Sequence, residues 1–366
     1  MVQKVPQSSI SGNSSFRSLL INGDMSICQR QPTQPGIQYS GYYSLDRWYL
    51  DISSTGTWTL SQSTTVPTGQ GFFNSSKFDC TTADTSLGSG DRLFYQQRIE
   101  DQFCTFLKKG TSSTASVTVS FWVRSNKTGT YICEIYDSHN SRHISKSYTI
   151  DSADTWEKKI IVFPGDTTGA FANDNGVGLQ LDFWLAAGTN YTSGTLATAW
   201  QANDATDRAV GQVNLADSTS NEWYLTGVQL EVGDAATDFE HLPHDVQLQR
   251  CQRYCFVNHL YSGVGGTGGA GSGQCNSTTR ADIPYHFPTT MRAIPTVSVS
   301  DATKLRVQHA GTVTALSSFS GEGDGTNGSF HTVMLYCTVS SGLTAGRGVN
   351  LIHNNATVNI TCDAEL

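Results

Sequence analysis

Two cysteines and one histidine recur at four-residue intervals in the second half of the chain: Cys251, Cys255 and His259. On one continuous helix this spacing would line a single face, and thiolate and imidazole groups are the ligands that zinc prefers. A structural zinc site needs a fourth ligand at a recognisable spacing, and the sequence shows none. We therefore expect these side chains to serve packing, and we expect neither a metal nor another cofactor.

An acidic and a basic residue stand side by side at the start of a predicted strand, Asp46 and Arg47. A surface ion pair or a turn anchor explains such a pair more simply than catalysis does. Hydrolysis of a glycosidic bond would need two carboxylates about 5 to 10 Å apart across a cleft. Asp182, Glu100 and Asp46 are available, but surface or turn roles suit them better. Because no GxSxG, HExxH or CxxC motif is present either, we expect the protein not to be an enzyme.

A glycine-rich run from Gly263 to Gly273 contains a formal GxGxxG pattern at Gly263, Gly265 and Gly268. A dinucleotide site needs this pattern between a strand and a helix, and no helical pattern follows it here. So much glycine is typical of a flexible hairpin loop or tip. We therefore expect a loop and no bound nucleotide.

Aromatic side chains gather in two polar stretches. Tyr39, Tyr42 and Tyr43 lie in GIQYSGYY, and Trp200 lies in a polar loop. Such rings can stack on the faces of sugars while amides and carboxylates bind the hydroxyl groups. The alternative is that the rings fold back over one end of a β-sandwich. These four residues are the candidate carbohydrate-binding residues.

Only 15% of the 366 residues are charged, and the formal net charge is −8. Few Glu, Lys and Arg residues among abundant Ser, Thr, Gly and Asn favour strands and turns over helices. None of the 23 basic residues form a run longer than two, so nucleic acid is not an expected partner. No apolar segment is long enough to span a bilayer, so we expect a soluble protein without membrane insertion.

Nine cysteines are spread along the whole chain. Their odd number and wide spacing do not resemble the framework of a small disulfide-bonded domain. We expect mostly buried, reduced thiols in a protein made in a cytoplasm.

Alternating apolar and polar residues predict a succession of strands in the first part of the chain. The clearest is 116–125, in which every second residue from position 117 to position 123 is a valine or phenylalanine. The segment 45–53 is expected to bury Trp48, and 19–30 is expected to form a first strand pair. The other predicted strands are 58–61, 92–100, 130–136, 156–163, 178–186 and 222–232. Strands separated by polar turns and loops predict a two-sheet antiparallel sandwich of the jelly-roll type.

The stretch 221–256 separates two β-rich parts. Its strand ends at Gly233-Asp234, and Pro243 can occupy the first turn of a short helix over 245–253. Further strands are predicted at 254–261, 296–299, 304–307, 312–315, 330–339, 349–352 and 357–361. We expect an all-β chain with an N-terminal arm (1–18), a jelly-roll domain (19–242), a helical linker (243–255) and a smaller C-terminal β-sandwich (256–366).

Five stretches between residues 19 and 256 carry a family resemblance: LLINGDMSICQR, SLDRWY, SFWVRSNKTGTY, FPGDTTGAFANDNGVGLQLDFWLAAG and WYLTGVQLEVGDAATDFEHLPHDVQLQRCQRYC. In combination they resemble virion proteins of tailed bacteriophages, of the tail-fibre-like family. The segment FPTTMRAIPTVSVS at 287–300 resembles the C-terminal part of the same family. Two departures stand out: Cys255 replaces the second aromatic residue that usually follows CQR, and the family's anchoring domain and long shaft are missing, so a compact knob is expected.

The resemblance implies a jelly roll similar to carbohydrate-binding modules, joined to a small β domain on a virion surface, in a homotrimer. We expect a non-enzymatic short fibre, spike or head knob that attaches to host-surface polysaccharide. The alternatives are a purely structural capsid or tail decoration protein and a glycan depolymerase. The arm of residues 1–18 is expected to dock on other virion proteins, because an added strand can extend a neighbour's sheet.

Overall fold

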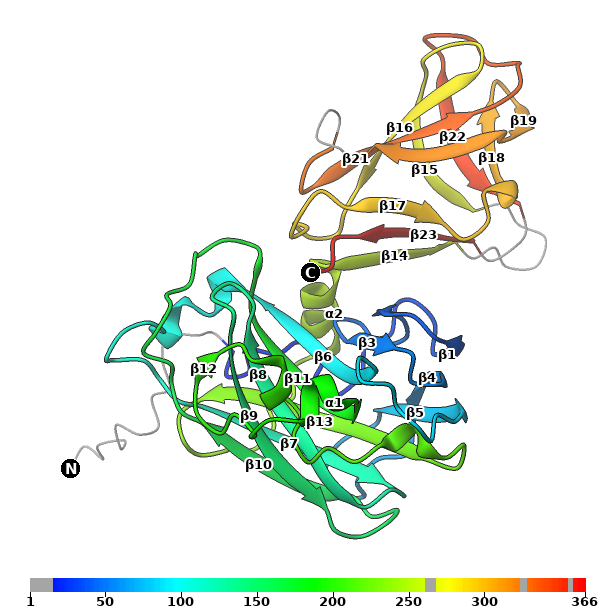
Figure 1. Ribbon diagram of the computed structural model, residues 1–366. Helices are drawn as coiled ribbons and strands as arrows, with labels where there is room; N and C mark the ends of the chain where they lie inside the picture. Colours follow the sequence, from blue (N-terminus) through cyan, green and yellow to red (C-terminus); the bar gives the residue numbers. More distant parts are fainter. Residues whose placement is uncertain (1–15, 261–267, 323–327, 355–357) are drawn as a thin grey trace. The chain divides into compact units, whose positions relative to one another are not determined.

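A computed structural model of the chain describes residues 16–260, 268–322, 328–354 and 358–366. The chain separates into an N-terminal unit, Met1–Gln247 with Leu366, and a C-terminal unit, Leu248–Glu365. The division falls inside helix α2 (His244–Gln252). Both units are built from antiparallel sheets, which confirms the predicted all-β class of two sandwiches connected along the chain by a short helix (Figure 1).

Two predictions fall wholly or partly outside the described residues. The expected N-terminal arm is described only from Phe16 onward, and the backbone N–H of Arg17 donates to Glu240 at 2.9 Å. Residues 261–267, which include the first part of the glycine-rich run, also lie outside the described residues. The remainder is not a loop as expected, because Gly269–Cys275 forms a strand.

The N-terminal unit contains two sheets (Figure 1). The six-stranded sheet runs in the order β1 (Thr33–Ile37), β4 (Thr57–Ser63), β5 (Ser75–Thr82), β13 (Glu222–Val232), β7 (Val117–Ser125) and β10 (Glu157–Phe163). The seven-stranded sheet runs in the order β12 (Gln201–Ala202), β9 (Arg142–Ile150), β8 (Gly129–Asp137), β11 (Val177–Ala187), β6 (Arg92–Glu100), β3 (Tyr49–Ser53) and β2 (Gly41–Tyr42). Helix α1 (Thr189–Thr192) and short 3-10 turns at Asp101–Phe103, Thr105–Leu107, Ala205–Asp207 and Leu215–Asp217 lie in the connections.

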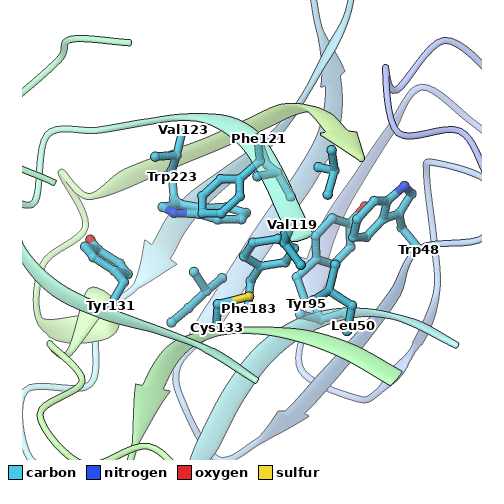
Figure 2. Close-up of a cluster of buried hydrophobic side chains, with 14 of the residues drawn as sticks. Trp48, Leu50, Tyr95, Val119, Phe121, Val123, Tyr131, Cys133, Phe183 and Trp223 are labelled. Carbon is cyan, nitrogen blue, oxygen red and sulfur yellow. The ribbon is translucent and has the colours of Figure 1, made fainter. Parts of the chain in front are cut away.

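An aromatic core fills the space between these sheets (Figure 2). Phe183 of the seven-stranded sheet meets the rings of Phe121 and Trp223, from the six-stranded sheet, at 5.0 and 6.2 Å. Trp48 is fully buried, as predicted, and stacks on Tyr95 at 5.1 Å. Burial of such rings contributes favourable free energy to the folding of this sandwich.

The predicted strand pair at 19–30 is wrong. Asn22 and Met25 adopt left-handed backbone angles, with φ of 59° and 60°, which end any extended run. The Asn22 side chain accepts a hydrogen bond from the Ile27 N–H and donates one to the Ile27 carbonyl, both at 2.8 Å. This side chain therefore replaces strand pairing with a compact turn.

The C-terminal unit pairs a small sheet with a large one. The three-stranded sheet contains β14 (Cys255–Leu260), β23 (Val358–Asp363) and β17 (Thr296–Val299). The seven-stranded sheet runs in the order β19 (Thr312–Ala315), β18 (Leu305–His309), β22 (Gly348–His353), β15 (Gly269–Cys275), β16 (Arg280–His286), β21 (Thr332–Thr338) and β20 (Ser318–Glu322), with a 3-10 turn at Ala302–Lys304. Side chains from both sheets form one separate core. No helix among the described residues of the whole chain is long and apolar enough to cross a membrane.

All nine cysteines are free thiols, and all except Cys28 are buried, as the sequence predicts. Burial raises the pKa of Cys28 and Cys80 to about 11 and that of Cys337 and Cys362 to about 12. These thiols are therefore protonated at neutral pH and serve as small apolar core groups.

Candidate functional site

The three residues with metal-like spacing do not share a helical face. Cys251 lies in α2, which ends at Gln252, whereas Cys255 and His259 lie on strand β14. Four residues on a strand span roughly 13 Å, and Cys255 is buried while His259 is exposed. In the part of the chain that the structure describes, no three His, Cys, Asp or Glu side chains are placed to hold a metal ion.

Asp46 and Arg47 are both buried, so the interpretation as a surface ion pair is wrong and the turn anchor is confirmed. The Asp46 carboxylate accepts hydrogen bonds from the backbone and side chain of Gln29, at 3.0 and 2.5 Å. Arg47 has a φ of 72° and donates to the Arg98 carbonyl at 2.6 Å. The pair thus fixes the entrance to strand β3.

The candidate carbohydrate-binding rings lie at opposite edges of one sheet. Tyr39, Tyr42 and Tyr43 are next to or in β2, and Trp200 precedes β12. These are the two edge strands of the seven-stranded sheet, six strand spacings or roughly 29 Å apart. The structure therefore does not bring the tyrosines and the tryptophan together.

Three of these four rings have partners within the N-terminal unit. Tyr43 donates to the Tyr39 carbonyl at 2.5 Å, and Trp200 donates to the Pro164 carbonyl at 2.6 Å. The ring of Tyr42 packs edge-on against Tyr49 at 4.9 Å. The Tyr42 hydroxyl donates to the carbonyl of Leu366, and Arg98 donates to the same oxygen, at 3.0 and 2.5 Å. Only Tyr39, which is 77% exposed, presents most of its ring to solvent.

The outer face of the seven-stranded sheet, turned away from the core, carries a buried ionic network. Asp182 on β11 lies directly opposite Glu134 on β8. Arg208 donates to both carboxylates, at 2.9 Å to Glu134 and 3.3 Å to Asp182. The guanidinium carbon of Arg208 also lies 4.8 Å from the Tyr136 ring centroid and 5.1 Å from that of Trp184. We call these five residues the closed face.

The two carboxyl groups of the closed face have opposite electrostatic surroundings. Burial opposes ionisation of Glu134, but the Arg208 charge and hydrogen bonds from His143 and Arg208 outweigh it and lower its pKa. Burial and the neighbouring Glu134 charge raise the pKa of Asp182 well above its usual range. Both side chains are fully buried beneath Arg208, so the network holds the Arg208 segment on the sheet and offers no carboxylate to a substrate.

An open pocket of about 620 Å³ lies within the N-terminal unit, and we call it the Phe73 pocket. The Phe73 side chain is 85% exposed, whereas the neighbouring Phe72 is buried and packs edge-on against Phe239 at 5.1 Å. The polar residues that line the pocket include Asp24, Ser26, Asn74, His241 and His244. A large ring open to solvent thus stands beside a carboxylate, an amide and two imidazoles.

Strand β13 positions both halves of the pocket. The Thr226 hydroxyl donates to the Asn74 carbonyl at 2.7 Å and approaches the Asp24 carbonyl at 3.4 Å. Gly227, with a φ of 62°, lies where the pairing of β13 with β7 is irregular. A Cβ atom at Gly227 would lie only 2.5 Å from the Phe72 ring, so glycine is needed for Phe72 to anchor the loop.

The carboxylate of the pocket is held in place. Asp24 accepts hydrogen bonds from the Ser26 hydroxyl at 3.0 Å and from the side-chain amide of Gln247 at 3.3 Å. Gln247 is itself buried, with 6% of its surface exposed. On the other side, the His241 ring packs 5.4 Å from Phe72. Fixed polar groups beside an exposed ring suit a ligand that has both apolar faces and hydroxyl groups.

Sequence reasoning missed this pocket. The available signal was a pair of adjacent phenylalanines in TGQGFFNSS, where Gly69 and Gly71 adopt left-handed φ angles of 76° and 83°. Of these two rings, Phe72 is buried and Phe73 is exposed. The opposite wall, with Asp24 and His241, is distant in sequence and was not predictable from the loop itself.

No protein-family model and no curated protein sequence matches this chain. Among solved structures, the enzymatically active domain of bacteriophage CBA120 tailspike protein 4 is 15% identical, with a TM-score of 0.30, over 51% of this chain and 19% of its own length. The TmCBM61 module, solved with beta-1,4-galactotriose, is 10% identical, with a TM-score of 0.30, over 59% of this chain and 99% of its own. A candidate sugar-binding protein from Bacteroides thetaiotaomicron VPI-5482 is 12% identical, with a TM-score of 0.32, over 59% of this chain and 100% of its own length. At TM-scores this low, we infer no function from them.

Proposed function

We propose that this protein binds glycan through the Phe73 pocket, without enzymatic activity, as a surface protein of a bacteriophage virion that attaches to the host. The observation that carries the proposal is the 85% exposed Phe73 ring next to Asp24 and Asn74 in a pocket of about 620 Å³. Leaving a large ring exposed forgoes the favourable free energy of its burial, and a sugar face stacked on the ring recovers part of it.

The polar lining fits the same ligand. An uncharged sugar presents C–H groups to the ring and hydroxyl groups to its surroundings, and the Asp24 carboxylate and Asn74 amide can take part in hydrogen bonds with those hydroxyls. Glycosidases commonly need a pair of carboxylates. Asp24 is the single carboxylate among the described residues that line the pocket, which favours binding over hydrolysis.

The virion part of the proposal depends on the resemblance of residues 19–256 to tail-fibre-like proteins. In that setting the chain is a short fibre, spike or head knob, assembled as a homotrimer and attached to other virion proteins through residues 1–18. Immunogold labelling of intact particles would locate it on the head or the tail. Absence of the protein from purified virions would exclude this whole class of function.

Binding is tested with the full chain on a glycan array that includes polysaccharide from the host surface. Phe73→Ala should weaken binding at least tenfold, because a ring at the centre of a binding site commonly contributes 2 kcal/mol or more, while stability stays within about 0.5 kcal/mol. Phe330→Ala is the matched control, since Phe330 is 48% exposed in the C-terminal unit.

Two further variants test whether glycan binds instead at the rings predicted from the sequence. If Tyr39→Ala or Trp200→Ala weakens binding and Phe73→Ala does not, the glycan site lies at a sheet edge and the Phe73 pocket is excluded. An array that stays blank favours the structural decoration protein. A depolymerase is indicated if the protein shortens host polysaccharide and Asp24→Asn stops the reaction.

A further inference from the structure

Two adjoining hollows lie along the large sheet of the C-terminal unit, and β14 of the small sheet contributes to the second. The first, of about 390 Å³, is lined by Ser272, Gln308, Gly311, Gly348 and Asn350, and we call it the amide hollow. The second, of about 420 Å³, is lined by Phe256, Asn258, Ser272, Pro284, Tyr285 and His286, and we call it the ring hollow. Because Ser272 lines both, the hollows form one continuous track over β18, β22, β15 and β16.

Strand register places the polar groups of the amide hollow in a row. Asn350 lies directly opposite Gln308 on β18 and Ser272 on β15. Neighbouring strands are about 4.8 Å apart, so the three side chains stand at regular intervals across the sheet. The Ser272 hydroxyl donates to the Asn350 carbonyl oxygen at 2.8 Å, and Gln308 makes no side-chain hydrogen bond with the described residues.

The amide hollow is open because residues that line it are glycines, which have no side chain to fill the space above the sheet. No heavy atom lies within 4 Å of a Cβ atom built on Gly348, although a neighbouring strand residue, Asn350, is exposed on the same face. Gly348 also lacks a left-handed φ angle, so backbone geometry does not require glycine there. The open space above the sheet is therefore a consequence of a missing side chain.

The chemistry of the track is uncharged. Among the described residues, neither hollow is lined by Asp, Glu, Lys or Arg. Side-chain amides both donate and accept hydrogen bonds, which matches hydroxyl groups. In the ring hollow, Phe256 of β14 stacks on the buried Tyr285 at 6.3 Å, whereas Pro284 and His286 are exposed on the other face of β16 and offer flat surfaces there. Amides followed by rings along one line suit an extended chain of neutral sugars.

We propose that this track is a second binding site, in the C-terminal unit, for a linear uncharged oligosaccharide. The ligand lies across the strands, with hydroxyl groups on Gln308 and Asn350 and further sugar units over Pro284 and His286. The proposal does not depend on the Phe73 pocket, which belongs to the other unit and contains a carboxylate.

The test measures binding of maltohexaose, cellohexaose and mannohexaose to the full chain by calorimetry, with an oligogalacturonate as the anionic comparison. Gly348→Phe fills the amide hollow and should weaken binding of a neutral hexasaccharide at least tenfold. Gly269→Phe is the matched control, because Gly269 also has open space around its Cβ position but does not line either hollow. Asn350→Ala should weaken binding about fivefold, as expected for one hydrogen-bonding group.

The outcomes separate the two proposed sites. Loss of binding in Gly348→Phe, with Gly269→Phe and Phe73→Ala unchanged, supports the track. If none of the three neutral hexasaccharides binds the Phe73→Ala variant, or if its binding survives when Gly348→Phe is added to that variant, the track is overturned while the Phe73 pocket is unaffected. Binding of oligogalacturonate alone at the track overturns the assignment of a neutral ligand.

Discussion

The closed face and the Phe73 pocket both combine aromatic rings with carboxylates, but they differ in what occupies the rings. On the closed face, Arg208 lies against Tyr136 and Trp184 and donates hydrogen bonds to the Glu134 carboxylate. In the pocket, no residue that the structure describes covers Phe73, which is 85% exposed. Aromatic rings and carboxylates alone therefore do not define a binding site. On the closed face, the same kinds of groups stabilise the fold because the Arg208 side chain occupies them.

The largest effect is expected from breaking the closed face. Arg208→Ala leaves the carboxylate of Glu134 buried without its cation and should lower the free energy of unfolding by about 3 to 5 kcal/mol. Urea unfolding at pH 7, followed by tryptophan fluorescence, measures this loss. All seven tryptophans lie between positions 48 and 223, so the signal follows the N-terminal unit alone.

A partly exposed ion pair is the control for Arg208→Ala. Arg124 pairs with Asp154 at 2.8 Å, and the Asp154 side chain is 57% exposed. Asp154→Asn should cost no more than about 1 kcal/mol, because water screens the charges of such a pair. Equal costs for the two variants would contradict the idea that burial makes the closed face important.

A smaller effect is expected where the two regions share their scaffold, at Gly227 of β13. Gly227→Ala places a methyl group against the Phe72 ring and should cost about 1 to 3 kcal/mol, while also weakening glycan binding because the Phe72 loop moves. The control is Gly69→Ala, since Gly69 has a similar φ of 76° but open space around its Cβ position. If both variants bind glycan equally well, the anchoring role of Phe72 is wrong.

The smallest effect per pH unit is expected from the titration of Asp182. Its folded-state pKa is raised, so the carboxyl group stabilises the fold below its unfolded pKa of about 3.9, and this contribution is lost as pH rises toward the folded pKa. Asp182→Asn does not titrate. The unfolding free energy of the wild type minus that of Asp182→Asn should therefore fall from about pH 4 upward, by at most about 1.4 kcal/mol per pH unit.

For Glu134 the same measurement should show a dependence of the unfolding free energy on pH of the opposite sign. Its folded pKa is lowered, so its stabilising contribution is present above the unfolded pKa and is lost as pH falls through the folded pKa. The wild type minus Glu134→Gln should therefore rise with pH over the acidic range. A difference that is flat for both variants would show that neither carboxyl group is perturbed.

The sequence predicts strands well where apolar and polar residues alternate, even where both faces are buried, as in β6 and β13. The predicted strands 92–100 and 222–232 coincide with β6 and β13, and 296–299 coincides with β17. Residues of opposite character alternate there, so period two is visible without knowledge of the fold. In contrast, β15 was missed because GAGSGQC has almost no side chains from which to read a pattern.

The site was less predictable than the fold, because it depends on partners that are remote in sequence. Nothing near Trp200 indicates that its ring nitrogen is bound by the carbonyl of Pro164, 36 residues away. Nothing near Glu134 indicates Arg208, 74 residues away. Whether a ring is free for a ligand is decided by such contacts, and tertiary structure alone supplies them.

The buried thiols allow the rate at which each unit opens to be measured separately. Cys104 and Cys133 are fully buried in the N-terminal unit, and Cys337 and Cys362 are fully buried in the C-terminal unit. A thiol reagent in solution can modify them only when the surrounding sheets separate, because the folded state keeps them both inaccessible and protonated. Mass spectrometry of the labelled chain therefore times the opening of the two sandwiches independently in one sample, without any engineered probe.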